Sequence, residues 1–392
     1  MNKRINVLFF IPELNQISGG LRQYSAALLK LLNEISDDYN FYIFHNGKDE
    51  EIMNILRFNY KLHWIDSNFS FATIENSFKK KIQRIKKILG IETKVLSPLD
   101  KLLLEYKIDI IHSPYQYLPN TVLPIKKIVT IHDVQELYFP HFFSAHERAW
   151  RAENYMNFIK EADRVVVSYN HIKNDIIRFF SKDEEKINVL LLKMDFLWFS
   201  KFSNRKKVNN ESKYLLYPAN FWEHKNHERL IHAIKLLKDR GVQVNLVLTG
   251  NNDNNVGSRI SQIIQELNLE DLIEIRGIVN EEELFNLYLN SHGVVVPTLY
   301  EAGSFPLMES ILLNIPVVCS NVTSLPDTIG DLKFIFNPYS IDDIAEKIEM
   351  LWTNEEFRKD AIKNNSIQKP KLIDTGAEDK LISLYNSIVS CS

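Results

Sequence analysis

Short apolar runs alternate with amphipathic stretches along the chain. In the first half, runs rich in valine and isoleucine predict strands at residues 5–11, 41–44, 108–112, 128–131 and 164–168. Between them, apolar positions at helical spacing predict helices at residues 21–35, 146–162 and 171–180. Strands and helices that alternate in this order indicate a parallel sheet with helices on both faces.

The pattern restarts after a polar stretch at residues 201–213. Later apolar runs predict a second set of strands at residues 214–217, 242–248, 272–276, 294–296, 316–319 and 333–336. One large sheet is the alternative, but 392 residues and a polar break near the middle favour two domains. We therefore expect an N-terminal α/β domain over residues 1–200, a linker over 201–213 and a C-terminal α/β domain over 214–375. A helix over 376–392 follows, with packing back on the first domain as one option.

Composition narrows the class of protein. Hydrophobic residues make up 45%, charged residues 25% and the net charge is −3, which is typical of a globular protein and unlike a nucleic-acid binder. The two cysteines, Cys319 and Cys391, give no metal-ligand spacing and no disulfide framework. The basic and then apolar N-terminus is interpreted as a strand rather than a signal peptide, because Pro12 and Glu13 interrupt it. No run of 18 apolar residues is present, so we expect a cytoplasmic protein.

Several common nucleotide and hydrolase motifs are absent from the sequence. It contains no G-x-x-x-x-G-K-[ST] phosphate loop, no G-x-G-x-x-G after a strand and no G-x-S-x-G. No two aspartates lie two positions apart, so no D-x-D pair is available to hold a cation on a diphosphate. Dehydrogenase, P-loop kinase and hydrolase interpretations therefore lose their support.

The most informative stretch is PTLYEAGSFPLMES, residues 297–310. It follows an apolar run and contains Glu301, a turn of small residues and a helical pattern from Pro306. Proline suits the first turn of a helix, and a turn that leads into a helix N-terminus presents unpaired N–H groups to an anion. Glu309 lies about one turn into this predicted helix.

This stretch resembles the motif of glycosyltransferase family 4 and its relatives of GT-B fold. In that family the first glutamate contacts the transferred sugar, the amides of the turn hold the diphosphate and the second glutamate binds the ribose hydroxyls. The resemblance implies these roles for Glu301, for Gly303 with Ser304 and Phe305, and for Glu309. The family often has Gly-Phe-Gly where this chain has Gly-Ser-Phe. The structural alternative is a helix-capping glutamate followed by a solvated one.

A second stretch, YPANFWEHKNH at residues 217–227, resembles the phosphate-binding loop of the same family. The resemblance implies that Lys225 meets the diphosphate. A diphosphate that leaves without a metal needs fixed cations and amides to meet its growing charge. Many members carry an arginine where this chain has Ala219 and Asn220, and Asn220 offers only a neutral hydrogen bond. A surface lysine without a function is the alternative.

Two smaller elements of the second half agree with the resemblance. Gly250 follows an apolar run, where the family often has a loop that lines the nucleotide site. Residues 276–279, with Ile278, resemble the segment whose backbone meets the base. Each is also compatible with an ordinary turn between a strand and a helix.

The first half contributes a glycine pair and a histidine. Gly19 and Gly20 lie between a predicted strand and helix, where the family has a glycine-rich loop near the donor phosphate and the acceptor. His132 follows a strand end and matches the family's histidine near the reacting sugar, whereas Asp133 is interpreted as a residue that orients the loop. A turn glycine and a structural histidine are the alternatives.

Residues 78–89 (FKKKIQRIKKIL) combine apolar positions at helical spacing with lysines and an arginine. A basic amphipathic helix of this kind lies on an anionic membrane surface in many peripheral proteins. An ordinary surface helix is an equal alternative.

The resemblance covers most of the chain and implies two Rossmann-like parallel α/β domains that face each other across a cleft (GT-B). It implies donor binding to the second domain, acceptor binding to the first, a hinge at the linker, no metal, no cofactor and net retention of configuration. Residues 132–144 resemble bacterial hexosyltransferases of surface-polysaccharide assembly, which favours GDP-mannose and a glycan or lipid-linked acceptor, as in lipopolysaccharide. The alternatives are a nucleotide-sugar epimerase, a glycan phosphorylase and a non-catalytic sugar-nucleotide-binding protein.

Overall fold

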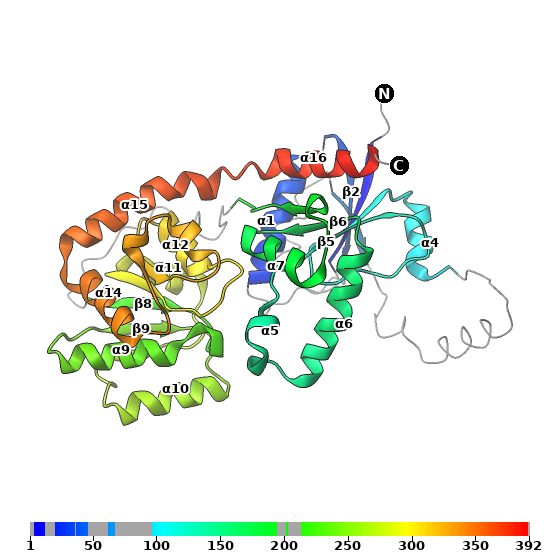
Figure 1. The fold of residues 1–392 in the computed structure, drawn as a ribbon. Coiled ribbons are helices and arrows are strands. Elements are labelled where there is room, and N and C mark those ends of the chain that lie inside the picture. Colours follow the sequence, from blue (N-terminus) through cyan, green and yellow to red (C-terminus); the bar gives the residue numbers. More distant parts are fainter. Residues whose placement is uncertain are drawn as a thin grey trace.

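The computed structural model describes residues 4–11, 20–35, 37–45, 62–66, 96–193, 201–202 and 213–390. These residues form two separate parallel sheets with helices on both faces, as Figure 1 shows. The predicted fold class is therefore confirmed. We call the first sheet and its helices domain one, and the second sheet and its helices domain two.

Domain one contains a seven-stranded sheet in the order β3-β2-β1-β4-β5-β6-β7. Its strands are β1 (Ile5–Phe10), β2 (Tyr39–His45), β3 (Leu62–Asp66), β4 (Ile110–Ser113), β5 (Lys126–Thr130), β6 (Arg164–Val167) and β7 (Ile187–Val189). Its helices are α1 (Gly20–Glu34), α4 (Pro98–Glu105), α5 (Gln135–Tyr138), α6 (Ala145–Glu161) and α7 (Asn170–Phe180). Helix α6 begins at a capping box in which Ser144 and Glu147 satisfy each other's backbone amides.

Domain two contains a six-stranded sheet in the order β10-β9-β8-β11-β12-β13. Its strands are β8 (Leu215–Pro218), β9 (Leu246–Thr249), β10 (Ile273–Ile275), β11 (Gly293–Val296), β12 (Val317–Ser320) and β13 (Ile335–Phe336). Its helices are α9 (His227–Asp239), α10 (Asn255–Glu266), α11 (Glu281–Asn290), α12 (Phe305–Leu312), α13 (Leu325–Ile329), α14 (Ile341–Thr353) and α15 (Glu355–Ile373).

Some predicted strand bounds were wrong. The predicted strand at residues 242–248 begins only at Leu246. Val242 and Val244 lie in the loop before it, where the Val242 amide donates to the Leu237 carbonyl of α9 and Val244 is buried in the core. Strands β3 and β7 were not predicted: β3 mixes polar with apolar residues, and β7 has three residues.

In both sheets the order in which successive strands are added reverses between the first and the fourth strand of the domain, at β1/β4 and at β8/β11. In sheets of this kind, ligands bind at such a switch point, beyond the carboxyl ends of the strands. In domain two the loops that follow β8 and β11 meet there. They contain Lys225 and Glu301.

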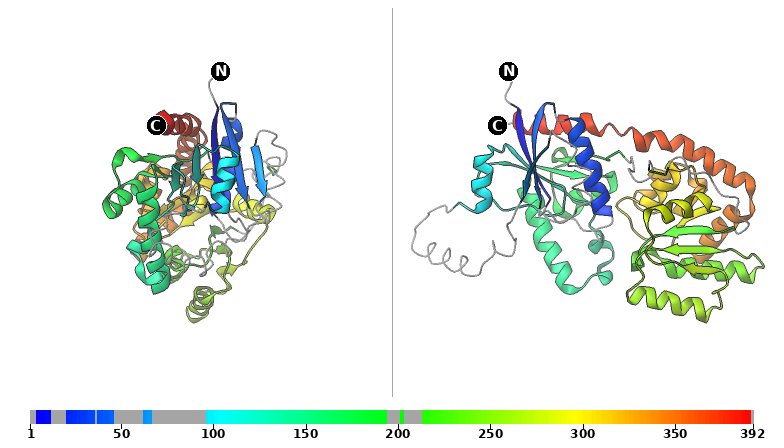
Figure 2. Two further views of the ribbon diagram at one scale, coloured as in Figure 1. Left: turned by 90° about the vertical axis from the view of Figure 1, so that its right-hand side faces the viewer. Right: turned by 180° about the vertical axis from the view of Figure 1, so that it is seen from behind.

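The C-terminal helix α16 (Ala377–Ser390) packs against domain one. In Figures 1 and 2, α15 lies on domain two and α16 continues across to α1. The hydroxyl of Tyr385 is hydrogen-bonded to Nδ1 of buried His112 at 2.9 Å, and Lys193 pairs with Glu378 at the start of the helix. The predicted linker over 201–213 stays a prediction, because residues 203–212 lie outside the described residues.

We expect the Tyr385 ring, rather than its hydroxyl alone, to hold α16 in place, because Tyr385 is fully buried in the core of domain one. Tyr385→Ala should lower the free energy of unfolding by ~3–5 kcal/mol. Tyr385→Phe, which leaves only Nδ1 of His112 without its partner, should cost ~1–3 kcal/mol. Urea unfolding of both variants measures the difference. Equal losses would show that the ring contributes nothing.

Candidate active site

An ion pair joins the two loops at the switch point of domain two. Nζ of Lys225 lies 2.5 Å from Oε1 of Glu301, and these side chains are 12% and 11% exposed. The residues are 76 positions apart and come from the loops after β8 and β11. Because a charge this far removed from water needs a partner, each side chain fixes the position of the other.

Asn226 holds these loops together. It has a left-handed backbone conformation (φ 61°), and its side-chain amide donates to the carbonyl oxygens of Pro297 and Pro338 at 2.8 and 2.9 Å. The carbonyl oxygen of His224 accepts two hydrogen bonds from the other loop, one from the Thr298 hydroxyl and one from the Leu299 backbone amide. Our sequence analysis missed Asn226. An asparagine directly before a helix was an available hint, because asparagine adopts this conformation more readily than most residues.

The small-residue turn leads into α12 as predicted from the sequence pattern. Ser304 occupies the N-cap position, Phe305 is the first helical residue and Pro306 lies in the first turn. The Ser304 side chain makes no capping bond, and its hydroxyl is buried without a hydrogen-bond partner among the described residues. The first turn contains no acidic residue. The helix N-terminus beside Gly303 thus has neither a side-chain cap nor an acidic residue to oppose an anion, and its dipole favours one.

Glu309 lies on α12, one turn beyond this N-terminus. It is 4% exposed, so the alternative of a solvated glutamate is wrong for this residue. The hydroxyl of Tyr288 donates to its Oε2 at 2.5 Å. Burial raises the pKa of Glu309 to about 7, and the Tyr288 hydrogen bond opposes this shift. Contact with ribose stays a prediction.

Gly250 and Asn220 have clear structural roles in the loops of domain two. Gly250 has φ 120°, and a Cβ atom on it would lie 2.5 Å from the Ala219 carbonyl oxygen, so only glycine fits. Oδ1 of Asn220 accepts from the Asn251 amide at 2.8 Å. Ile278 is 78% exposed in the loop after β10, and contact of its backbone with a base stays a prediction.

His132 follows β5 in domain one. Its Nε2 donates to the carbonyl oxygen of Pro114 at 2.8 Å, and burial lowers the pKa of the ring, which leaves Nδ1 as an acceptor. Asp133 accepts weakly from the Gln135 amide and pairs with Arg151 at 3.5 Å, which orients the loop. Gly20 is the first residue of α1, whereas Gly19 and residues 78–89 lie outside the described residues.

Two tyrosines cross between the domains beside Glu301. Tyr300 of domain two is 4% exposed and lies against the rings of Tyr138, Phe139 and His171 at 5.7, 6.2 and 6.5 Å. Tyr169 of domain one lies against Gly303, and its hydroxyl is 3.7 Å from the Met308 sulfur. This pair, which we call the tyrosine clasp, brings α5 and the loop between β6 and α7 close to the loop after β11. No sequence signal marks it, because each contact joins residues far apart in the chain.

Two doubly wound domains with such a site at the switch point define a GT-B type glycosyltransferase. Residues 199–368 match the family described as Glycosyl transferases group 1, and residues 72–191 match Glycosyltransferase Family 4. The chain therefore belongs to the group 1 and family 4 glycosyltransferases and is an enzyme of that class.

Relatives and solved structures agree. The chain is 25% identical over 290 residues to O-antigen chain mannosyltransferase B of Escherichia coli, which covers 72% of this chain and 75% of the relative. It superposes on a glycosyltransferase from Rickettsia africae with a TM-score of 0.69 at 18% identity, over 99% of this chain and 100% of the other. Anabaena Alr3699/HepE in complex with UDP-glucose gives 0.67 at 14%, over 98% and 100%. These two likenesses concern the fold alone.

Among the described residues, no helix is long and apolar enough to cross a bilayer. Within the same residues, no three histidines, cysteines, aspartates or glutamates are grouped so that they could hold a metal ion.

The raised pKa of Glu309 predicts a pH-dependent stability. Because the folded-state pKa is about 7 and the ordinary value 4.5, its contribution is fully present below about pH 4.5 and is lost as the pH rises through 7. Glu309→Gln should flatten this part of the stability curve. Urea unfolding from pH 4.5 to 8 measures it, with the surface variant Glu266→Gln as control. Parallel curves for Glu309→Gln and the native chain would contradict the buried carboxyl.

The tyrosine clasp predicts a non-additive pair of substitutions. A Cβ on residue 303 would lie 2.7 Å from the Tyr169 ring, so Gly303→Ala should displace Tyr169 at a cost of ~1–3 kcal/mol and open the cleft. In the background of Tyr169→Ala, the same change should have little further effect. The radius of gyration from small-angle X-ray scattering and the melting temperature report both effects. Additive effects would exclude the contact.

Proposed function

We propose that this enzyme transfers mannose from GDP-mannose to a hydroxyl of a glycan or lipid-linked glycan, with retention of configuration and without a metal ion. The Lys225–Glu301 pair near the N-terminus of α12, which has no side-chain cap, is the observation that carries the proposal. A cation, a carboxylate and the positive end of a helix dipole lie together at the switch point where a sugar nucleotide would bind.

The leaving diphosphate needs positive charge as its bond to the sugar breaks. Lys225 would supply a fixed cation, and the amides of Gly303, Ser304 and Phe305 would supply hydrogen bonds and the positive end of the α12 dipole. The buried hydroxyl of Ser304, which has no hydrogen-bond partner among the described residues, would complete this anion site. Together these groups would compensate the charge of the diphosphate, a task for which other enzymes use a metal ion.

The sugar would lie between the diphosphate and domain one. Glu301 would then exchange part of its contact with Lys225 for hydroxyls of the transferred sugar, and Glu309 would bind the ribose. His132, neutral and with Nδ1 free to accept, would contact the reacting sugar from the loop after β5. In the proposed front-face reaction, the bond from the anomeric carbon to the diphosphate breaks and the acceptor oxygen bonds on the same face. The acceptor proton passes to a phosphate oxygen.

The choice of donor rests on the relatives. The E. coli relative is named as an O-antigen chain mannosyltransferase, which supports mannose and surface-polysaccharide assembly. The Anabaena structure holds UDP-glucose, which supports a nucleotide-sugar donor of some base. Peripheral membrane contact through residues 78–89 is part of the proposal for a lipid-linked acceptor.

A thermal-shift panel tests the donor. The protein is treated with EDTA and then mixed with GDP-, UDP-, ADP- and dTDP-linked hexoses. A donor at 100 times its Kd should add ~2.7 kcal/mol of stability. A shift with GDP-mannose, together with transfer of mannose to an α-mannoside, supports the proposal. A shift with another donor alone would show that the proposed nucleotide base, guanine, is wrong. An altered sugar formed without acceptor indicates an epimerase, and binding without turnover on any acceptor indicates a binding protein.

Lys225→Ala should lower transfer by about 10²–10³-fold, because it removes the cation and leaves Glu301 buried without its partner. Lys235→Ala, which removes an exposed lysine of α9 in the same domain, is the matched control and should transfer normally. Initial rates with radiolabelled GDP-mannose measure both. Turnover of Lys225→Ala near that of the control would refute the assigned role.

A further inference from the structure

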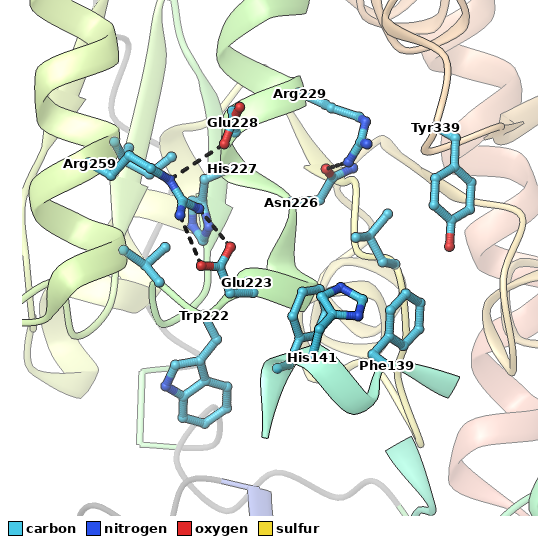
Figure 3. Close-up of a pocket in the computed structure, with 14 residues that line it drawn as sticks. Phe139, His141, Trp222, Glu223, Asn226, His227, Glu228, Arg229, Arg259 and Tyr339 are labelled. Carbon is cyan, nitrogen blue, oxygen red and sulfur yellow. Dashed lines mark hydrogen bonds and ion pairs between the residues drawn. The ribbon is translucent and has the colours of Figure 1, made fainter. Parts of the chain in front are cut away.

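A cavity lies at the junction of the two domains. It has a volume of about 300 Å³ and is lined by a loop of domain one and by the start of α9 and one side of α10 in domain two. Figure 3 shows His141 and Phe139 from domain one on one side, with Trp222, Arg259 and Arg229 from domain two around them. No residue of the Lys225–Glu301 pair lines it.

The cavity and the candidate active site are built from the same two loops. Glu223 and Leu299 line the cavity, whereas Lys225 and Glu301, two residues further along each loop, form the ion pair and do not line it. Phe139 lines the cavity and also contacts Tyr300 of the tyrosine clasp. The cavity therefore has a lining different from the ion pair but shares its structural support.

Aromatic rings dominate one part of the lining. Trp222 and Tyr339 are 48% and 54% exposed, and the Arg229 guanidinium lies 5.6 Å from the centre of the Tyr339 ring. Phe139 and Phe142 of domain one stack on each other at 5.1 Å. Exposed rings at the edge of a cavity offer flat apolar faces, which suit the C–H face of a pyranose ring.

The charges of the lining cancel. Arg259 forms two bonds with Glu223, at 3.0 and 2.6 Å, and a longer contact with Glu228 at 3.5 Å, as Figure 3 shows. Arg229 donates to Oδ1 of Asn226 at 3.0 Å. Two arginines and two glutamates give no excess of either sign. The balance disfavours a phosphate or a second nucleotide, and favours a neutral ligand rich in hydroxyl groups.

We propose that this cavity is a second carbohydrate subsite, which binds one neutral sugar unit of the acceptor glycan away from the unit that reacts. The sugar would stack on Trp222 or Tyr339, and its hydroxyls would bond to the carboxylates and guanidinium groups around them. The volume lies at the lower end of the ~300–1,000 Å³ typical of ligand pockets, which suits a single unit. This inference rests on the proposed function.

Because both domains supply the walls, occupancy depends on how they are arranged. Phe139, His141 and Phe142 come from domain one, and the rest of the lining comes from domain two. A longer acceptor that fills the cavity therefore favours the arrangement in which the tyrosine clasp is formed. The enzyme would prefer a growing chain to a single sugar.

The dependence of transfer on acceptor length distinguishes a defect in this subsite from a defect in the active site. Transfer to α-mannosides of one to four units is measured for the native enzyme, Trp222→Ala and Tyr339→Ala. Trp150→Ala, an equally exposed tryptophan outside the cavity lining, is the control. We expect the native enzyme and the control to favour the longer acceptors. In the two cavity variants the ratio of kcat/KM for the longest to the shortest acceptor should fall about tenfold, through KM.

Binding of the acceptor is also measured without turnover, through tryptophan fluorescence. Mannotetraose should quench the tryptophan fluorescence of the native enzyme and of Trp150→Ala, but not that of Trp222→Ala, whereas inorganic pyrophosphate should leave the Trp222 signal unchanged. An unchanged length preference in both cavity variants, or a Trp222 response to pyrophosphate alone, would overturn the subsite. Failure of every donor to bind would instead overturn the proposed function, because the length test presupposes transfer.

Discussion

The Lys225–Glu301 ion pair is the interaction on which the rest of the site depends. Two charged side chains that are only about one-tenth exposed are costly to bury apart, so their contact holds the loops after β8 and β11 together. Asn226 supports this contact by adopting the left-handed conformation and donating to the carbonyl oxygens of Pro297 and Pro338. The pair therefore helps to fix the position of the turn before α12.

The tyrosine clasp extends this constraint to domain one. Tyr300 directly precedes Glu301 and inserts among rings of domain one, and Tyr169 fills the space that a side chain on residue 303 would need. The glycine of the turn is thus required by the contact between domains, and in the proposed function it would also allow a diphosphate to approach. Helix α16 adds a second connection, because it leaves domain two and is buried in the core of domain one. Changes in the cleft are consequently coupled to the way in which the domains meet.

Different residues of these loops offer different chemistry. The ion pair and the N-terminus of α12 combine a cation, a carboxylate and a helix dipole, which suit a charged donor. The cavity has balanced charges and exposed rings, which suit neutral sugar units. The bonds from Thr298 and Leu299 to the His224 carbonyl tie the two loops together. In the proposed function, donor and acceptor would therefore use the same pair of loops without competing for the same charges.

The sequence by itself determined the class of fold and the position of the main motif, because alternating apolar runs and a proline in the first helical turn are local properties of the chain. It also placed Lys225 and Glu301 in loops that follow strands, whereas only the structure showed that these strands are neighbours. Only the tertiary structure decided that Glu309 is buried against Tyr288, that Asn220 binds the backbone and that Tyr169 lies on Gly303. Each of these contacts joins residues from separate elements. Burial and partnership therefore depend on how strands and helices pack, which the local pattern does not specify.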